Sequence, residues 1–204
     1  TIIPGDDWTV GVGMPVIVVF SSPVKNKQAA VSALTVKSTP EVEGAWRWFS
    51  STEVHWRPKE YWPTGAKVLV TAATSKVELA SGVWGKRTVT SSFSIGRSQI
   101  MTVDVAKHRL TVERDGAVVK TLPVTTGKAG FRTRNGIKVV MSRESQVRMD
   151  ASTLGTDKND PDYYNLLVNW ALRVTYSGEF LHAAPWSVGS QGRANVSHGC
   201  TGLS

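Results

Sequence analysis

Apolar and polar positions alternate along most of the chain with the period of two that is typical of β-strands. Gly, Pro and Asp residues separate the alternating stretches, and no stretch of the first half carries the apolar stripe of an amphipathic helix. We expect this half to be an antiparallel β-sandwich with short loops. Its clearest predicted strands are residues 16–20, 53–56, 67–72 and 88–95.

The second half is also predicted to be mainly β, arranged as a meander. Alternating residues flank the pair Asp115-Gly116, which is the strongest short-range signal for a hairpin, and Asn135-Gly136 marks another turn. Residues 144–165 lack strong periodicity, which predicts a long loop of the kind that often forms a lid over a functional site. The predicted strands are residues 102–105, 108–114, 117–124, 137–142, 166–176 and 179–182.

One strand pattern ends and another begins around Gly96-Arg97-Ser98, where we place a domain boundary. The chain is therefore predicted to be all-β, with one domain over residues 1–97 and a second over residues 98–204.

The composition indicates a globular protein: 41% of the residues are hydrophobic and 20% are charged. No apolar run approaches the roughly 20 residues of a membrane-spanning helix, and the first residues lack the plan of a secretion signal, so an export segment or membrane tether would have to lie upstream. The net charge of the chain is +8, and each predicted domain contributes +4 of it. Because no basic face is concentrated in one region, nucleic acid is not an expected partner.

Six of the eight tryptophans lie in the first half. Flat indole rings stack on sugar rings, so this density of tryptophans is compatible with carbohydrate binding. The alternation of Trp46, Trp48 and Trp56 favours packing in the sandwich core instead. We expect this domain to serve as a spacer, because it has no cluster of titratable residues.

Cys200 is the only cysteine, so the chain has no internal disulfide. Its thiol is either an inert buried side chain or a reactive nucleophile. A thiol of ordinary pKa needs a neighbouring base, and His182 lies eighteen positions upstream at the end of a predicted strand. Gly199 allows a sharp backbone turn, and the N–H groups of Gly199 and Cys200 are candidates for an oxyanion hole. His198 is either part of this chemistry or structural.

The acidic stretch 157–162 contains Asp157, Asp160 and Asp162 but lacks the glycine turn and the distal Glu of a calcium loop. We interpret it as a solvated loop and expect no metal site there.

The block Ser197-His198-Gly199-Cys200, with His182 upstream in Phe180-Leu181-His182-Ala183-Ala184-Pro185-Trp186, resembles the signature of the L,D-transpeptidases, whose catalytic domain is the YkuD type. The resemblance extends to Thr125-Thr126-Gly127-Lys128 and Tyr176-Ser177-Gly178. In the first half, Gly44-Ala45-Trp46-Arg47-Trp48, Val54-His55-Trp56-Arg57-Pro58 and Tyr61-Trp62-Pro63 resemble the immunoglobulin-like domain that precedes this catalytic domain in mycobacterial and related enzymes.

The resemblance implies a role for each matched residue. Cys200 is the nucleophile, and His182 is the general base, oriented by a backbone carbonyl such as that of Ala183. The lid contributes Tyr164 to the oxyanion hole that Gly199 and Cys200 form. The remaining implied site residues are Ser177 and Gly178 in the donor-stem site, Ser197 and His198 in the nucleophile turn, and Trp186 as a pocket wall or a core residue.

The sequence departs from the family pattern in two places. The motif usually continues as Cys-hydrophobic-Asn, whereas Thr201 and Gly202 follow Cys200 here, so the amide that binds substrate or braces the loop is absent. Relatives also continue beyond the position of Ser204, so we expect the printed chain to omit a C-terminal portion.

The implied function is a cysteine acyltransferase of the cell wall, outside the cytoplasm. Its partners would be the stem peptides of peptidoglycan, joined by 3→3 cross-links with release of D-alanine, and it would be acylated by carbapenems without any cofactor. Two alternatives stay open from the residues alone. One is a Cys/His peptidase or amidase that passes the same thioester to water, and the other is a wall-binding module without catalysis.

Overall fold

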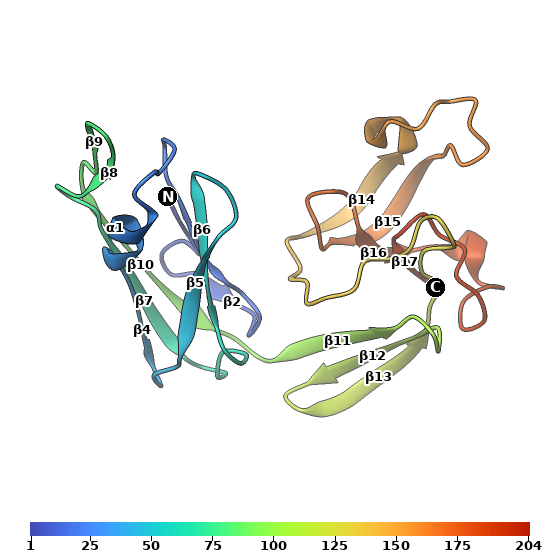
Figure 1. Ribbon diagram of the computed structural model, residues 1–204. Coiled ribbons are helices and arrows are strands. Elements are labelled where there is room, and N and C mark those ends of the chain that lie inside the picture. Colours follow the sequence, from blue (N-terminus) through green and yellow to red (C-terminus); the bar gives the residue numbers. More distant parts are fainter. The chain divides into compact units, whose positions relative to one another are not determined.

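The computed structural model describes all 204 residues, and they form two compact units, Thr1–Gln99 and Ile100–Ser204 (Figure 1). The predicted all-β class is confirmed, since both units consist of sheets, with one short α-helix and two 3-10 turns. None of these helical segments is long and apolar enough to cross a membrane.

The first unit is a sandwich of two four-stranded sheets and a small hairpin. One sheet has the order β1-β3-β6-β5, from Ile2–Ile3, Val16–Val19, Glu53–Pro58 and Gly44–Trp48. The other has the order β2-β10-β7-β4, from Thr9–Val10, Thr88–Ile95, Lys67–Ala73 and Leu34–Thr39. The hairpin pairs β8 (Glu78–Ala80) with β9 (Val83–Trp84).

Tryptophans fill the core between these sheets, as the alternation predicts. Trp56 and Trp62 are buried with ring centroids 5.1 Å apart, and Trp46 and Trp48 pack partly buried against the same cluster. The indole Nε1 of Trp62 also donates a hydrogen bond of 2.7 Å to the carbonyl of Met14. The core interpretation of Trp46, Trp48 and Trp56 is therefore confirmed.

Two features of the first unit differ from the prediction. The β2–β10 pair is parallel within the otherwise antiparallel sandwich. A helix, α1 (Lys27–Ser32), was also not predicted; its six residues are too few to show a helical period. Asn26 caps it by accepting a hydrogen bond from the N–H of Ala29.

The second unit contains two further sheets. One is the meander β11-β12-β13, from Gln99–Asp104, Arg109–Arg114 and Ala117–Pro123. The turn between β12 and β13 is the predicted Asp115-Gly116 pair, with φ of 49° and 83° as a two-residue hairpin loop requires. The other sheet has the order β14-β15-β16-β17, from Ser142–Asp150, Asn165–Arg173, Phe180–Ala183 and Thr201–Leu203.

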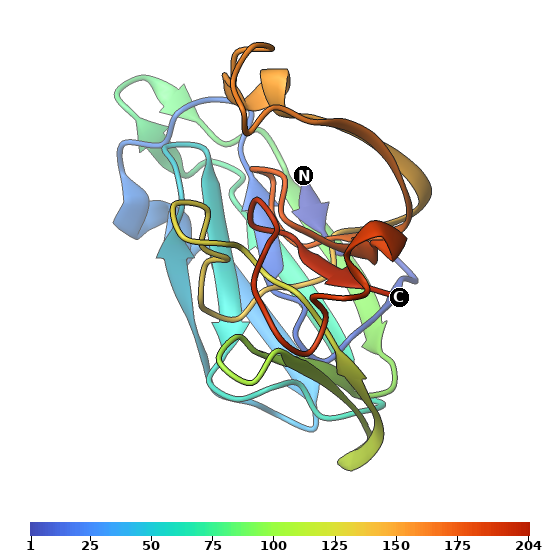
Figure 2. The same cartoon turned by 90° about the vertical axis from the view of Figure 1, so that its right-hand side faces the viewer.

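The predicted long loop 144–165 is confirmed for residues 151–164 and wrong for residues 144–150. Its first part belongs to β14, which pairs with β15 in a long antiparallel hairpin, and the irregular part is the tip, residues 151–164, which opens with the 3-10 turn η1 (Ala151–Leu154). Figure 2 shows this hairpin as a long curved ribbon ending at η1. No residue of β14 is buried, and only Val147 and Met149 are apolar, so its sequence shows little of the apolar alternation by which strands are recognised.

The predicted strand 137–142 is also wrong, because the chain is irregular there and β14 begins only at Ser142. Residues 131–141 instead run as a loop whose polar side chains contact other parts of the unit. Apolar residues in a short run fit such a loop as well as a strand, so the pattern alone does not distinguish them.

Candidate active site

Cys200 ends a tight turn immediately before β17. Gly199 has a φ of +120°, which side-chain-bearing residues rarely adopt, so the turn requires glycine at this position. The Ser197 hydroxyl closes the turn: it donates a hydrogen bond of 2.6 Å to the carbonyl of Cys200 and accepts one of 3.1 Å from the N–H of Gly199.

The sheet register places Cys200 and His182 on the same face. Strands β16 and β17 are parallel, with Leu181 opposite Thr201 and His182 opposite Gly202. Successive side chains of a strand point to opposite faces of the sheet. Leu181 and Thr201 therefore lie on one face, and His182 lies on the other. Cys200 packs against the buried cluster that includes Phe180, two residues before His182 and on its face.

The imidazole of His182 is buried and held in a defined orientation. Its Nδ1 lies 2.8 Å from the carbonyl oxygen of Ala183, which is the acceptor that the family resemblance implies. Donation from Nδ1–H leaves Nε2 as the unprotonated nitrogen of the neutral ring. The indole of Trp186 stacks on the ring at 5.9 Å between centroids. Burial lowers the pKa of His182, so the ring is neutral at neutral pH and able to accept a proton.

The thiol of Cys200 does not donate to His182 in this structure. Its Sγ lies 3.7 Å from the carbonyl oxygen of Gly178, to which it donates a weak hydrogen bond. Burial raises the pKa of the thiol, so the neutral SH form prevails at neutral pH. The pair is therefore a neutral thiol and a neutral imidazole, and the nucleophile needs a base for activation.

The backbone N–H of Gly199 is not free to act as an oxyanion-hole donor in this structure, contrary to the prediction. It donates to the hydroxyl of Ser197 and is therefore occupied. The turn holds this donor in place, but Ser197 would have to release it before it could stabilise a developing negative charge.

His198 connects the turn to the tip of the β14–β15 hairpin. Its ring contacts the rings of Phe131 and Tyr164, with centroids 4.7 Å and 5.0 Å away, and its Nε2 is 3.2 Å from a carboxylate oxygen of Asp162. Asp162 also pairs with Lys128. These contacts lower the pKa of Asp162, mainly through Lys128 and then through His198. His198 thus connects the nucleophile turn to the tip of the hairpin, and Asp162 contacts both His198 and Lys128.

Tyr164 lies at the base of the tip, half-buried near the thiol. Burial raises the pKa of its phenol, and the negative charge of a Cys200 thiolate would raise it further. The hydroxyl is therefore protonated at neutral pH and available as a donor.

Two acidic residues of the tip accept backbone hydrogen bonds from within the tip. Asp157 accepts from the N–H of Asn159, and Asp160 accepts from the N–H of Asp162. No group of three or more His, Cys, Asp or Glu side chains in the chain is arranged to hold a metal ion.

A buried polar segment braces the approach to the turn. Thr125 and Thr126 are almost fully buried; the Thr125 hydroxyl donates to the carbonyl of Ala194, and Asn195 accepts from both the N–H and the hydroxyl of Thr126. Gly202, where the family resemblance leads us to expect Asn, exchanges two backbone hydrogen bonds with Thr125. A Cβ there would lie 3.0 Å from the Cβ of Ala184, so this packing favours glycine.

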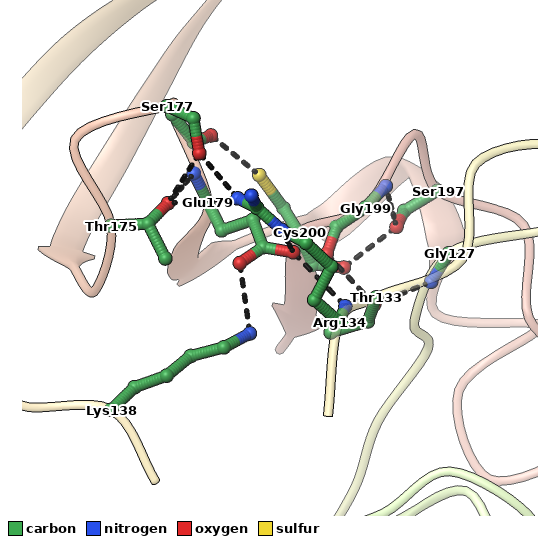
Figure 3. A network of polar contacts seen from close by, with 11 residues as sticks. Gly127, Thr133, Arg134, Lys138, Thr175, Ser177, Glu179, Ser197, Gly199 and Cys200 are labelled. Carbon is green, nitrogen blue, oxygen red and sulfur yellow. Dashed lines mark hydrogen bonds and ion pairs between the residues drawn. The ribbon is translucent and has the colours of Figure 1, made fainter. Parts of the chain in front are cut away.

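Three charged residues that were not predicted form a cluster beside the thiol (Figure 3). The carboxylate of Glu179 is buried and accepts from the backbone N–H of Arg134 at 3.0 Å and from its Nε at 3.2 Å. The Nζ of Lys138 lies 2.8 Å from its other oxygen. The one sequence signal was a Glu at the start of an apolar strand, since buried carboxylates need charged partners. Arg134 also donates to the exposed Ser177 hydroxyl.

Comparisons with known proteins agree with this arrangement. Residues 1–78 match the family of bacterial Ig domains, and residues 98–204 match the family of L,D-transpeptidase catalytic domains. The chain is 43% identical over 203 residues to L,D-transpeptidase 2 of Mycobacterium tuberculosis, covering 100% of this chain and 50% of that protein. It spans about half the length of this relative and 44% of L,D-transpeptidase 5 of the same species, to which it is 39% identical over 206 residues.

A solved structure shows the same fold. The LD transpeptidase LdtMt1 in complex with imipenem superimposes with a TM-score of 0.88 at 37% identity, covering 100% of this chain and 88% of that chain. The predicted pairing of an immunoglobulin-like domain with a YkuD-type domain is thereby confirmed. From its sequence and its fold, this chain belongs to the L,D-transpeptidase family.

Proposed function

We propose that the protein is a peptidoglycan L,D-transpeptidase that works through a thioester on Cys200. The observation that carries this proposal is the shared face of β16 and β17, which holds the single thiol of the chain and a buried neutral imidazole with an unprotonated Nε2. Membership in the family supplies the reaction class.

The reaction consists of two acyl transfers. The thiol leaves the Gly178 carbonyl and gives its proton to Nε2 of His182, and Sγ attacks the carbonyl between the third residue of a tetrapeptide stem and its terminal D-alanine. The C–N bond breaks, His182 returns the proton to the leaving amine, and D-alanine departs. The side-chain amine of a second stem then attacks the thioester, loses its proton to His182 and regenerates the thiol.

The other groups of the site have supporting parts in this proposal. The N–H of Cys200, the N–H of Gly199 once Ser197 releases it, and the Tyr164 hydroxyl stabilise the oxyanion. Ser177 and Gly178 line the donor site, and Trp186, which is 57% exposed, forms its wall beside His182. Residues 1–97 act as a spacer for the catalytic domain of residues 98–204, and the protein works outside the cytoplasm at the cell wall.

A mass-spectrometric experiment tests the proposal. We expect imipenem to add covalently to Cys200 and a tetrapeptide stem to yield a cross-linked dimer with free D-alanine, and Cys200→Ala to lose both products. His182→Ala should slow acylation by about 10²–10⁴-fold. The matched control His55→Ala, in the first unit, should leave acylation unchanged. Free tripeptide without dimer would indicate a hydrolase, and the absence of any adduct would indicate a binding module.

A further inference from the structure

Ion pairs fix the chain segment that accepts the hydrogen bond of the Cys200 thiol. Gly178, whose carbonyl accepts from Cys200, directly precedes Glu179, and Glu179 directly precedes β16. The Glu179 side chain is 11% exposed and meets two cations, Arg134 and Lys138, which come from the irregular loop of residues 131–141. Figure 3 shows the carboxylate between these two side chains, with the sulfur of Cys200 close to the same segment.

The same loop also contacts the nucleophile turn. The Thr133 hydroxyl donates to the carbonyl of Gly199 at 2.7 Å and accepts from the N–H of Gly127 at 2.9 Å. Its neighbour Arg134 reaches Glu179 and Ser177. The loop thus connects both chain segments that position the thiol: the turn that bears Cys200 and the segment that bears its hydrogen-bond acceptor.

We propose that Arg134, Glu179 and Lys138 act as positioning residues for Cys200, fixing the 177–180 segment beside the thiol and setting the balance of charge that the thiolate meets. This inference rests on the proposed role of Cys200 as the nucleophile. It goes further because it assigns a role in nucleophile activation to three residues that lie outside the Cys/His motif.

The two signs of charge in the cluster act on the thiol in opposite directions. Burial is the largest cause of the raised pKa of Cys200, and a hydrogen bond from the backbone of Phe180 lowers the pKa; the carboxylate of Glu179 then raises it, and the ammonium of Lys138 lowers it. Glu179 is itself ionised, because burial, which would raise its pKa, is outweighed by Lys138 and Arg134. Glu179 therefore carries a full negative charge beside the thiol, and the two cations of the cluster offset that charge.

The other titratable and charged groups around the thiol are not substituted in variants of this cluster. They are Tyr164 at the base of the hairpin tip, His182 on β16, and His198 in the nucleophile turn with its partner Asp162. A shift in the titration of Cys200 that follows the sign of the removed charge would therefore report on the cluster.

The test measures the alkylation rate of the chain by iodoacetamide as a function of pH. Cys200 is the only cysteine, so the reaction reports on this thiol alone and needs no substrate. We expect Glu179→Gln to move the midpoint to lower pH and Lys138→Gln to move it to higher pH, each by up to about one pH unit. The double variant should return towards the parent midpoint. Acylation by imipenem should shift in parallel.

A matched pair of variants provides the control. Lys107 and Asp104 form an ion pair of 3.4 Å in the turn between β11 and β12, and Lys107→Gln and Asp104→Asn should leave the midpoint unchanged. Circular dichroism melts establish that each variant is folded. If Glu179→Gln does not fold, Lys138→Gln decides alone, because its side chain lies nearer the surface at 21% exposure.

The outcomes separate this inference from the proposed function. Midpoints that move in opposite directions support the positioning role even where no cross-linked product forms. Folded variants whose midpoints do not move, or move in the same direction, overturn it, even if the parent chain is a fully active transpeptidase. A purely structural role would lower the melting temperature without this dependence on sign.

Discussion

The two units of the molecule are stabilised by different kinds of interior. The first unit holds 17 of the 25 buried hydrophobic residues but only one buried polar residue, Ser91. The second unit holds eight buried hydrophobic residues and seven buried polar or charged ones. These seven are Thr125, Thr126, Glu179, His182, Ser187, Gln191 and Thr201.

The difference shows what each interior is suited to do. Apolar packing is non-directional, so the core of the first unit sets a stable shape without fixing any particular polar atom. Buried polar groups must be hydrogen-bonded, and their partners fix direction as well as distance. Asn195, for example, contacts His108, Thr126 and the carbonyl of Val105 at once. The second unit thereby holds its polar groups in fixed positions, as a catalytic site requires.

The largest expected effect tests whether the apolar core is independent of the site. Trp62→Ala should lower the free energy of unfolding of the first unit by about 3–5 kcal/mol, because it removes an almost fully buried ring and its hydrogen bond to Met14. The exposed Trp8→Ala, measured in parallel by calorimetry, should stay within about 0.5 kcal/mol. Imipenem acylation should persist in both variants, and its loss in Trp62→Ala would contradict the comparison.

Acidification should affect the second unit selectively, because it alone buries titratable groups, Glu179 and His182. Both have a lowered pKa in the folded chain, so the unfolded chain binds protons first as the pH falls. Stability should decrease below the ordinary His pKa of 6.5, and again below the ordinary Glu pKa of 4.5. Calorimetry across this pH range measures the stability of each unit. In His182→Gln the decrease that begins near pH 6.5 should be absent. A first-unit transition that falls equally would break the comparison.

The smallest effect concerns the tip of the β14–β15 hairpin. Asp162→Asn removes the ion pair with Lys128 and weakens the hydrogen bond with His198, while this partly exposed site makes little contribution to global stability. We expect unchanged melting but faster amide exchange in residues 155–164, measured by mass spectrometry. Asp157→Asn, which lacks these ionic partners, is the matched control. Equal exchange in both variants would show that Asp162 does not anchor the tip.

Local signals in the sequence predicted the features that depend on near neighbours. The Asp115-Gly116 hairpin formed as predicted because its two residues adopt the turn by themselves, and the Trp46, Trp48 and Trp56 alternation produced the expected core. The prediction failed for β14, in which only Val147 and Met149 are apolar, and for α1, which is too short to show a helical period. It also failed for residues 137–141, where an apolar run forms a loop.

The sequence by itself determined the all-β class, the family and the residues around Cys200, because the nucleophile turn lies within four consecutive residues. Only the tertiary structure decided what the thiol contacts. Its acceptor Gly178 lies 22 positions away, and Arg134 meets Glu179 across 45 positions. Contacts over such separations depend on the path of loops and the register of strands, and local residue patterns carry no information about either.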